Sequence, residues 1–256
     1  MGFAEMTEIQ EKTIPVMLAG RDVIAKAPTG TGKTCAFGIP VAEHIQPENK
    51  YPQAVIMAPT RELAQQIAEE LSNLTYFMPE VQVACVYGGA NMEKQAKRLA
   101  EGCQIVVATP GRLMDHYKHH NIDLDHVTQV VLDEADEMLN MGFLDDIDEI
   151  LSHVPQDRKM LMFSATMPAE IARISRKYMK DPVEFVAGNR NEGSKNVRHI
   201  YYMVKAQDKY LALKRIVDNS PNIYGIVFCR TKRETQEVAD KLIADGYNAD
   251  CLHGDL

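Results

Sequence analysis

The sequence predicts an α/β fold in which a parallel sheet carries helices on both faces. Short, almost continuous apolar runs alternate with stretches of helical pattern, and a polar or glycine-containing cluster follows most of the runs. Strands that are buried on both faces have this continuous apolar character, and helical crossovers make them parallel. The predicted strands lie at 22–25, 54–58, 83–87, 105–108, 130–132, 160–163 and 183–187.

The length of the chain allows one large domain, or one domain followed by part of another. The chain has 256 residues, 45% of them hydrophobic, which is ordinary for a protein with a real core. A polar, glycine-containing stretch at 188–197 is typical of a linker between a first domain at 1–187 and a second at 198–256. The α/β pattern resumes there with strands expected at 199–204, at 224–229 and up to His253, and helices at 208–218 and 231–245. This second part is too short to cover its own faces, so we expect an incomplete domain.

Several classes of protein are disfavoured. The five cysteines form no C-x-x-C pair, which argues against a zinc ribbon or a redox dithiol. No apolar run is long enough for a bilayer, so we expect no membrane partner and a cytoplasmic location. The net charge of −8 argues against indiscriminate binding of polyanions, and a nucleic-acid site must therefore be argued from particular residues.

The stretch APTGTGKT after the first predicted strand is typical of a phosphate-binding loop. A strand, a glycine-containing loop and a helix N-terminus turn backbone N–H groups toward an anion. Lys33 supplies a cation for the β- and γ-phosphates, and the Thr34 hydroxyl supplies a ligand for Mg²⁺. The nucleotide-binding residues predicted here are Ala27, Pro28, Thr29, Gly30, Thr31, Gly32, Lys33 and Thr34.

Upstream of this loop lies a second candidate for nucleotide recognition. An aromatic ring at Phe3 can stack on a base, and the carboxamide of Gln10 can both donate to and accept from adenine. The alternative is that 3–10 is only the start of an amphipathic helix that runs to Leu18.

Two acids, Asp133 and Glu134, follow the apolar run at 130–132 and supply the second half of a candidate NTPase site. A carboxylate at a strand end beside the phosphate loop can hold Mg²⁺, and its neighbour can orient and deprotonate the attacking water. We assign the metal role to Asp133 and the base role to Glu134. Acids at this place also serve simply as helix N-terminal residues.

The motifs APTGTGKT, PTRELA, Gly88-Gly89, TPGR, DEAD and SAT occur in the order and spacing of one family. The chain resembles DEAD-box ATP-dependent RNA helicases of the bacterial type over its whole length. Phe3, Thr7 and Gln10 fit the Q motif of that family, although Met6 stands where the family usually has Pro. The resemblance implies a RecA-like first domain and a second RecA-like domain that is truncated before the motif with the arginine finger.

By this resemblance the cofactors are ATP and Mg²⁺, and the partner is RNA bound through its phosphate backbone. Ser164 and Thr166 would couple nucleotide state to the grip on RNA. The residues that would touch RNA are Pro59, Thr60, Arg61, Gly88, Gly89, Thr109, Pro110, Gly111 and Arg112 in the first domain and Arg230, Thr231, His253, Gly254 and Asp255 in the second. Guanidinium groups at strand ends can hold phosphates without reading bases, although each such arginine singly is more often paired within its own protein.

The resulting hypothesis is an ATP-dependent RNA helicase core that hydrolyses ATP, with weak activity in this chain because the second domain is incomplete. An ATP-gated RNA clamp and a DNA translocase on the same fold are the alternatives. Ribosome or RNA-degradation partners would bind through flanking tails that are absent here. His116, His119, His120 and His126 are interpreted as a solvated loop, the acids at 145–149 as an exposed helix face, and the methionines as core-filling residues.

Overall fold

The computed structural model describes residues 5–27, 31–186, 198, 200–220 and 222–254. The chain divides into two units, 1–192 and 193–256. The division falls inside the polar stretch that the sequence predicts as a linker.

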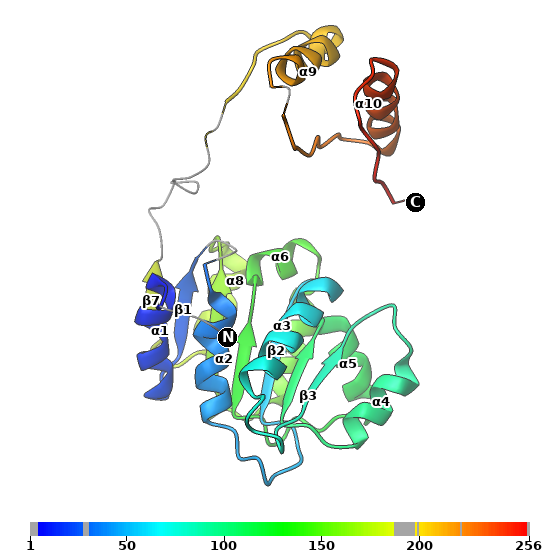
Figure 1. The fold of residues 1–256 in the computed structure, drawn as a ribbon. Coiled ribbons are helices and arrows are strands. Elements are labelled where there is room, and N and C mark those ends of the chain that lie inside the picture. The colour runs from blue at the N-terminus through cyan, green and yellow to red at the C-terminus, as the bar shows by residue number, and fades with distance from the viewer. Residues whose placement is uncertain (1–4, 28–30, 187–197, 199, 221, 255–256) are drawn as a thin grey trace. The chain divides into compact units, whose positions relative to one another are not determined.

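The first unit is built on a seven-stranded sheet in the order β3-β4-β2-β5-β6-β1-β7, in which every pairing is parallel (Figure 1). The strands are β1 (Val23–Lys26), β2 (Ala54–Met57), β3 (Val83–Val86), β4 (Ile105–Ala108), β5 (Gln129–Leu132), β6 (Lys159–Ser164) and β7 (Val183–Val186). All seven predicted apolar runs are strands, which confirms the predicted fold class.

Eight helices are described in this unit. They are α1 (Glu8–Leu18), α2 (Lys33–Glu43), α3 (Arg61–Leu74), α4 (Met92–Ala100), α5 (Pro110–Lys118), α6 (Ala135–Asn140), α7 (Leu144–His153) and α8 (Ala169–Tyr178). The helix after the phosphate loop begins at Lys33.

Alternate residues of the central strands enter two separate cores, one on each face of the sheet. Val55 and Met57 of β2 pack with side chains of α4 to α8, whereas Ala54 and Ile56 pack with side chains of α1, α2 and α3. Successive side chains of a strand point to opposite faces, so a sheet covered on both sides needs apolar residues at every position. This arrangement explains the continuous apolar runs.

The second unit differs from the prediction. Its helices, α9 (Lys209–Asp218) and α10 (Lys232–Ala244), lie close to the predicted ranges, and a short 3₁₀ helix, η1 (Ala206–Asp208), precedes α9. The strands predicted at 199–204, at 224–229 and before His253 are wrong, because no described residue of these runs is in a strand. Tyr224 and Phe228 are 105% and 91% exposed. An apolar run persists as a strand only where neighbours pair with its backbone and cover its side chains.

No helix in the described part of the chain has the length and apolar character needed to cross a membrane.

Asp22, immediately before β1, ties the amino ends of three strands together. Its carboxylate is 3% exposed and accepts hydrogen bonds from the backbone N–H groups of Met160 (2.9 Å) and Lys180 (2.6 Å). Met160 belongs to β6, and Lys180 lies just before β7. The neighbours of β1 on both sides are therefore fixed by one side chain.

We expect Asp22→Ala to lower the free energy of unfolding by about 2 to 4 kcal/mol, because the buried Met160 N–H and the partly buried Lys180 N–H lose a charged acceptor. Urea denaturation followed by circular dichroism measures this change. The control is Asp157→Ala, at an exposed carboxylate near the same end of the sheet. Equal unfolding free energies for the two variants would contradict the role of Asp22.

Candidate functional site

The candidate site lies along the carboxyl ends of the strands. β6 lies between β1 and β5 in the sheet, so the loop after β1 and the acids after β5 meet at the end of β6. In open parallel sheets ligands bind outside this edge. The topology therefore brings together residues that are about 100 positions apart in the sequence.

Lys33 and the two acids form the centre of the site. The Lys33 Nζ atom lies 3.5 Å from Oδ1 of Asp133 and 3.7 Å from Oε1 of Glu134. Lys33 is 7% exposed and Asp133 is 2% exposed. The structure thus brings together the three side chains that the sequence assigns to phosphate binding, metal binding and base catalysis.

The environment of Asp133 is suited to a cation. Burial raises the pKa of its carboxyl group, Lys33 opposes this rise, and Glu134 adds to it. Its buried Oδ1 atom accepts no well-oriented hydrogen bond within the described residues. The described part of the chain holds no cluster of three or more acidic, His or Cys side chains for a metal. Mg²⁺ commonly uses one or two carboxylates together with substrate phosphates and water, so Asp133 and Thr34 fit this ion.

Glu134 has a backbone conformation that its sequence does not reveal. Its φ and ψ angles are 54° and 51°, in the left-handed region that non-glycine residues rarely adopt. This conformation costs of the order of 1 kcal/mol and is common at functional sites. It turns the chain sharply between β5 and α6, so that Glu134 as well as Asp133 lies next to Lys33.

Asp136 is a site residue that the sequence analysis missed. Its Oδ2 atom accepts hydrogen bonds from both the backbone N–H and the hydroxyl of Thr166, each at 2.8 Å. The Ser164 hydroxyl accepts from the Asp136 N–H at 3.3 Å and donates to the Thr166 carbonyl at 2.6 Å. Burial alone would raise the pKa of Asp136, but the hydrogen bonds from Thr166 and Ser164 hold it below its usual value. The DEAD and SAT motifs are therefore physically joined.

The start of α1 contacts the phosphate loop. The Gln10 amide accepts from the Thr7 N–H at 2.9 Å and donates to the Gly32 carbonyl at 3.0 Å. A Cβ atom on Gly32 would lie 2.6 Å from the Gln10 amide nitrogen, and its φ of 84° also favours glycine. Gln10 thus contacts the loop directly, and recognition of adenine by Gln10 stays a prediction.

Four of the predicted nucleotide-binding residues, Phe3, Pro28, Thr29 and Gly30, lie outside the described residues. Ala27, where the generic loop pattern has Gly, is buried and donates its N–H to the Ser164 carbonyl at 3.2 Å. This hydrogen bond joins the start of the phosphate loop to the end of β6.

The predicted RNA-contacting residues after β2 differ in exposure and in the contacts that they make. Arg61 is exposed and pairs with the neighbouring Glu62 at 2.9 Å. Thr60 caps α3 by accepting the Leu63 N–H at 3.2 Å. Pro59 is buried, and so is Pro110 at the first turn of α5, so these rings shape the backbone at strand ends.

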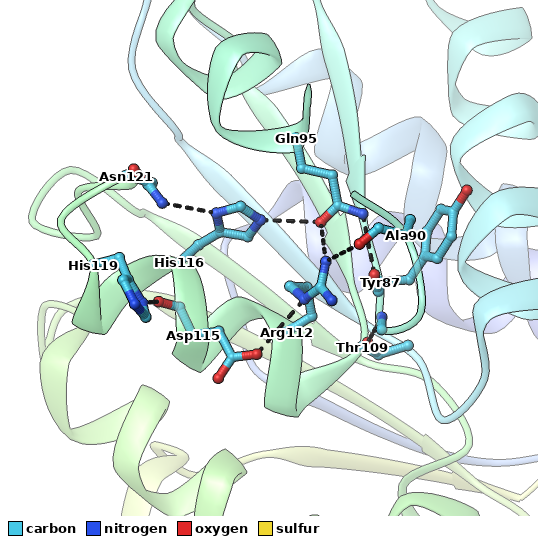
Figure 2. Close-up of polar contacts among 10 residues, drawn as sticks. Tyr87, Ala90, Gln95, Thr109, Arg112, Asp115, His116, His119 and Asn121 are labelled. Atoms are coloured by element: carbon cyan, nitrogen blue, oxygen red, sulfur yellow. Dashed lines mark hydrogen bonds and ion pairs between the residues drawn. The ribbon is translucent and has the colours of Figure 1, made fainter. Parts of the chain in front are cut away.

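Arg112 is held inside the protein (Figure 2). Its Nη1 atom donates to the Ala90 carbonyl and to the Gln95 carboxamide oxygen, each at 3.0 Å, and its Nε atom lies 3.6 Å from Asp115. The side chain is 12% exposed. The guanidinium is thus engaged by three partners of its own chain, as the alternative for a single arginine expects, and contact of Arg112 with RNA stays a prediction.

His116 is not in a solvated loop, as the sequence suggested, but is fully buried on α5. One ring nitrogen, Nε2, lies 3.0 Å from the Gln95 oxygen, and the other, Nδ1, lies 3.3 Å from the Asn121 amide nitrogen (Figure 2). Because an amide oxygen only accepts, we assign the ring proton to Nε2. Burial lowers the pKa of His116, Arg112 lowers it further, and Asp115 opposes this.

Predicted RNA-contacting residues of the second unit lie near the N-terminus of α10. Thr231 caps this helix by accepting the Glu234 N–H at 3.1 Å, and Arg230 donates its N–H to the Glu234 carboxylate at 3.1 Å. A Cβ atom on Gly254 would lie 3.6 Å from Lys232. His253 belongs to the same segment as Gly254, and Asp255 lies outside the described residues.

The fold and the site together define the protein class. The sequence matches the DEAD/DEAH box helicase family over residues 7–174, and the chain belongs to that family. The solved structure of a DEAD box protein from the hyperthermophile Methanococcus jannaschii is 40% identical and superposes with a TM-score of 0.69, covering all of this chain and 68% of that one. The first unit is thus a RecA-like domain.

Curated relatives give the same result. The chain is 51% identical to the ATP-dependent RNA helicase CshA of Limosilactobacillus reuteri, 46% identical to the DEAD-box ATP-dependent RNA helicase CshA of Bacillus subtilis, and 43% identical to the ATP-dependent RNA helicase DeaD of Mycobacterium tuberculosis. Each match covers the whole of this chain and 51%, 52% and 45% of the relative. The chain spans about half the length of these relatives.

We expect the stability of the protein to fall as the pH drops below about 6.5, the ordinary pKa of histidine. The pKa of folded His116 is lowered, so the unfolded chain binds a proton that the folded chain does not, and acid favours unfolding. Urea denaturation at pH 5 to 8 should show a steeper loss for the wild type than for His116→Gln, which lacks the titrating group. Identical pH dependence in both proteins would refute this assignment.

Proposed function

We propose that this chain is part of an ATP-dependent RNA helicase, which binds ATP with Mg²⁺ and an RNA backbone at one sheet edge and couples ATP hydrolysis to local duplex separation. The observation that carries the proposal is the buried Lys33–Asp133 pair, with Glu134 at 3.7 Å from the same nitrogen. The names of the relatives support an RNA substrate, and guanidinium and backbone N–H groups at strand ends are suited to recognition of the phosphate backbone.

Each side chain of the centre has a distinct role in this proposal. Lys33 leaves its acidic partners to hold the β- and γ-phosphates. Asp133 and Thr34 would hold Mg²⁺, which neutralises phosphate charge when it is bound. Glu134 orients the attacking water and accepts its proton.

The contact of Asp136 with Thr166 gives a route from hydrolysis to RNA. Asp136 lies two residues after Glu134, and Thr166 follows β6 next to the segment that leads into α8. A shift of Glu134 after hydrolysis would move Asp136 and strain its hydrogen bonds to Thr166. We propose that this link transmits nucleotide state, as the resemblance implies for Ser164 and Thr166.

We also propose that residues 1–256 alone turn over ATP weakly. They contain no counterpart of the arginine finger motif that the family resemblance implies, and loss of such a finger costs a factor of about 10³ to 10⁵ in rate. For the longer protein we propose a cytoplasmic location and association with ribosomes or RNA-degrading assemblies.

The proposal is tested by ATP hydrolysis with and without single-stranded RNA. Glu134→Gln should reduce the rate by about 100-fold or to the detection limit, because it removes the general base, while binding of fluorescent ADP is retained. Glu137→Gln, at an exposed acid one turn further along α6, is the matched control and should hydrolyse ATP at the wild-type rate. Equal rates in Glu134→Gln and wild type would rule out the assigned base.

A further inference from the structure

Gln95 of α4 is a buried polar side chain that the proposed mechanism has not used. It is 8% exposed and makes three hydrogen bonds to two other segments (Figure 2). Its amide nitrogen donates to the Tyr87 carbonyl at 3.0 Å. Its oxygen accepts from Arg112 and from His116, each at 3.0 Å. A side chain with this many buried partners fixes the segments that it joins.

The segment held by these contacts is the loop with Gly88 and Gly89. Gln95 binds the carbonyl just before the two glycines, and Arg112 binds the carbonyl of Ala90 just after them. The Gly88 N–H also points to the Thr109 hydroxyl at 3.4 Å. The loop is therefore fastened at both ends to Gln95 and to the first turn of α5.

The outer side of this loop is open. A Cβ atom on Gly88 or Gly89 would meet no heavy atom of the described chain within 4 Å. Packing therefore does not require glycine at Gly88, whereas Gly89 has a φ of 81° that favours it. A bare backbone that faces open space allows close approach of a ligand backbone.

We propose that Gln95 is a positioning residue for RNA, which holds the Gly88–Gly89 loop and Arg112 in one fixed geometry so that the loop backbone meets the phosphate–sugar chain. In this arrangement Arg112 connects the loop to α5 through its hydrogen bond to the Ala90 carbonyl. The inference rests on the proposed function, because it assumes that RNA binds at this edge. Fixing the loop in the free protein lowers the entropy lost when RNA binds.

The test uses Gln95→Met, which keeps the side-chain volume and removes all three hydrogen bonds. We expect affinity for a short single-stranded oligouridine, measured with a non-hydrolysable ATP analogue and Mg²⁺, to fall about tenfold, as for loss of one net buried hydrogen bond. Affinity for fluorescent ADP should not change. Amide hydrogen exchange of Gly88 and Gly89 should become faster than in the wild type.

Gln129→Met is the matched control. Gln129, also a buried glutamine and 6% exposed, lies at the amino end of β5, at the opposite edge of the sheet, and donates to the Val41 carbonyl of α2. The Gln129→Met variant should leave both RNA affinity and the hydrogen exchange of the Gly88–Gly89 loop at wild-type values. Gln95→Glu keeps the acceptor for Arg112 and His116 but loses the donor to Tyr87, and should weaken RNA binding by about threefold. This variant serves if Gln95→Met does not fold.

The outcomes distinguish failure of the positioning role of Gln95 from failure of the proposed function. Unchanged RNA affinity in Gln95→Met and Gln95→Glu, or an equal loss in Gln129→Met, would overturn the positioning role while the proposed function stands. If the wild-type chain itself binds no RNA, the proposed function fails and the inference fails with it.

Discussion

The pairing of Lys33 with Asp133 is the interaction around which the first unit is organised. It places a cation and two carboxylates at the junction of β1, β5 and β6, where Lys33 and Asp133 are buried and Glu134 is partly exposed. Burying an unpaired charge there would be prohibitively costly, so each charge requires the other in the free protein. Under the proposed function, nucleotide phosphates would take Lys33 and Mg²⁺ would take Asp133 in place of these contacts. Lys33 and Asp133 thus balance each other's buried charge in the free protein.

Hydrogen bonds between loops extend this centre along the sheet edge. Gln10 joins α1 to the phosphate loop, Asp136 joins the acids after β5 to Thr166 after β6, and Gln95 joins the loop after β3 to α5. Each link connects segments that are separate in the sequence. A parallel sheet places the loops at the carboxyl ends of its strands along one edge. Hydrogen bonds from polar side chains then hold these neighbouring segments in fixed positions.

The sequence predicted the sheet, the phosphate loop, the acidic pair and the family because these features are local patterns. Apolar continuity, a loop motif and two acids at a strand end can each be recognised within a few residues. It failed for His116 and for the strands of the second unit, and it did not identify the partners of Arg112. The residues next to a histidine in the sequence do not indicate whether it is buried. The residues next to an arginine at a helix start do not indicate which groups it will contact. Apolar runs such as 224–229 have strand character, but strand pairing is a contact between distant segments.

The sequence by itself therefore determined the alternation of strands and helices and the chemical groups that each strand end carries. Only the tertiary structure decided which of these groups meet. The order of strands set the 3.5 Å approach of Lys33 to Asp133, and packing of α4 on α5 turned Arg112 toward Gln95. The physical reason is that hydrophobic pattern is encoded residue by residue, whereas the burial and hydrogen-bond partners of a polar side chain depend on segments far away in the chain.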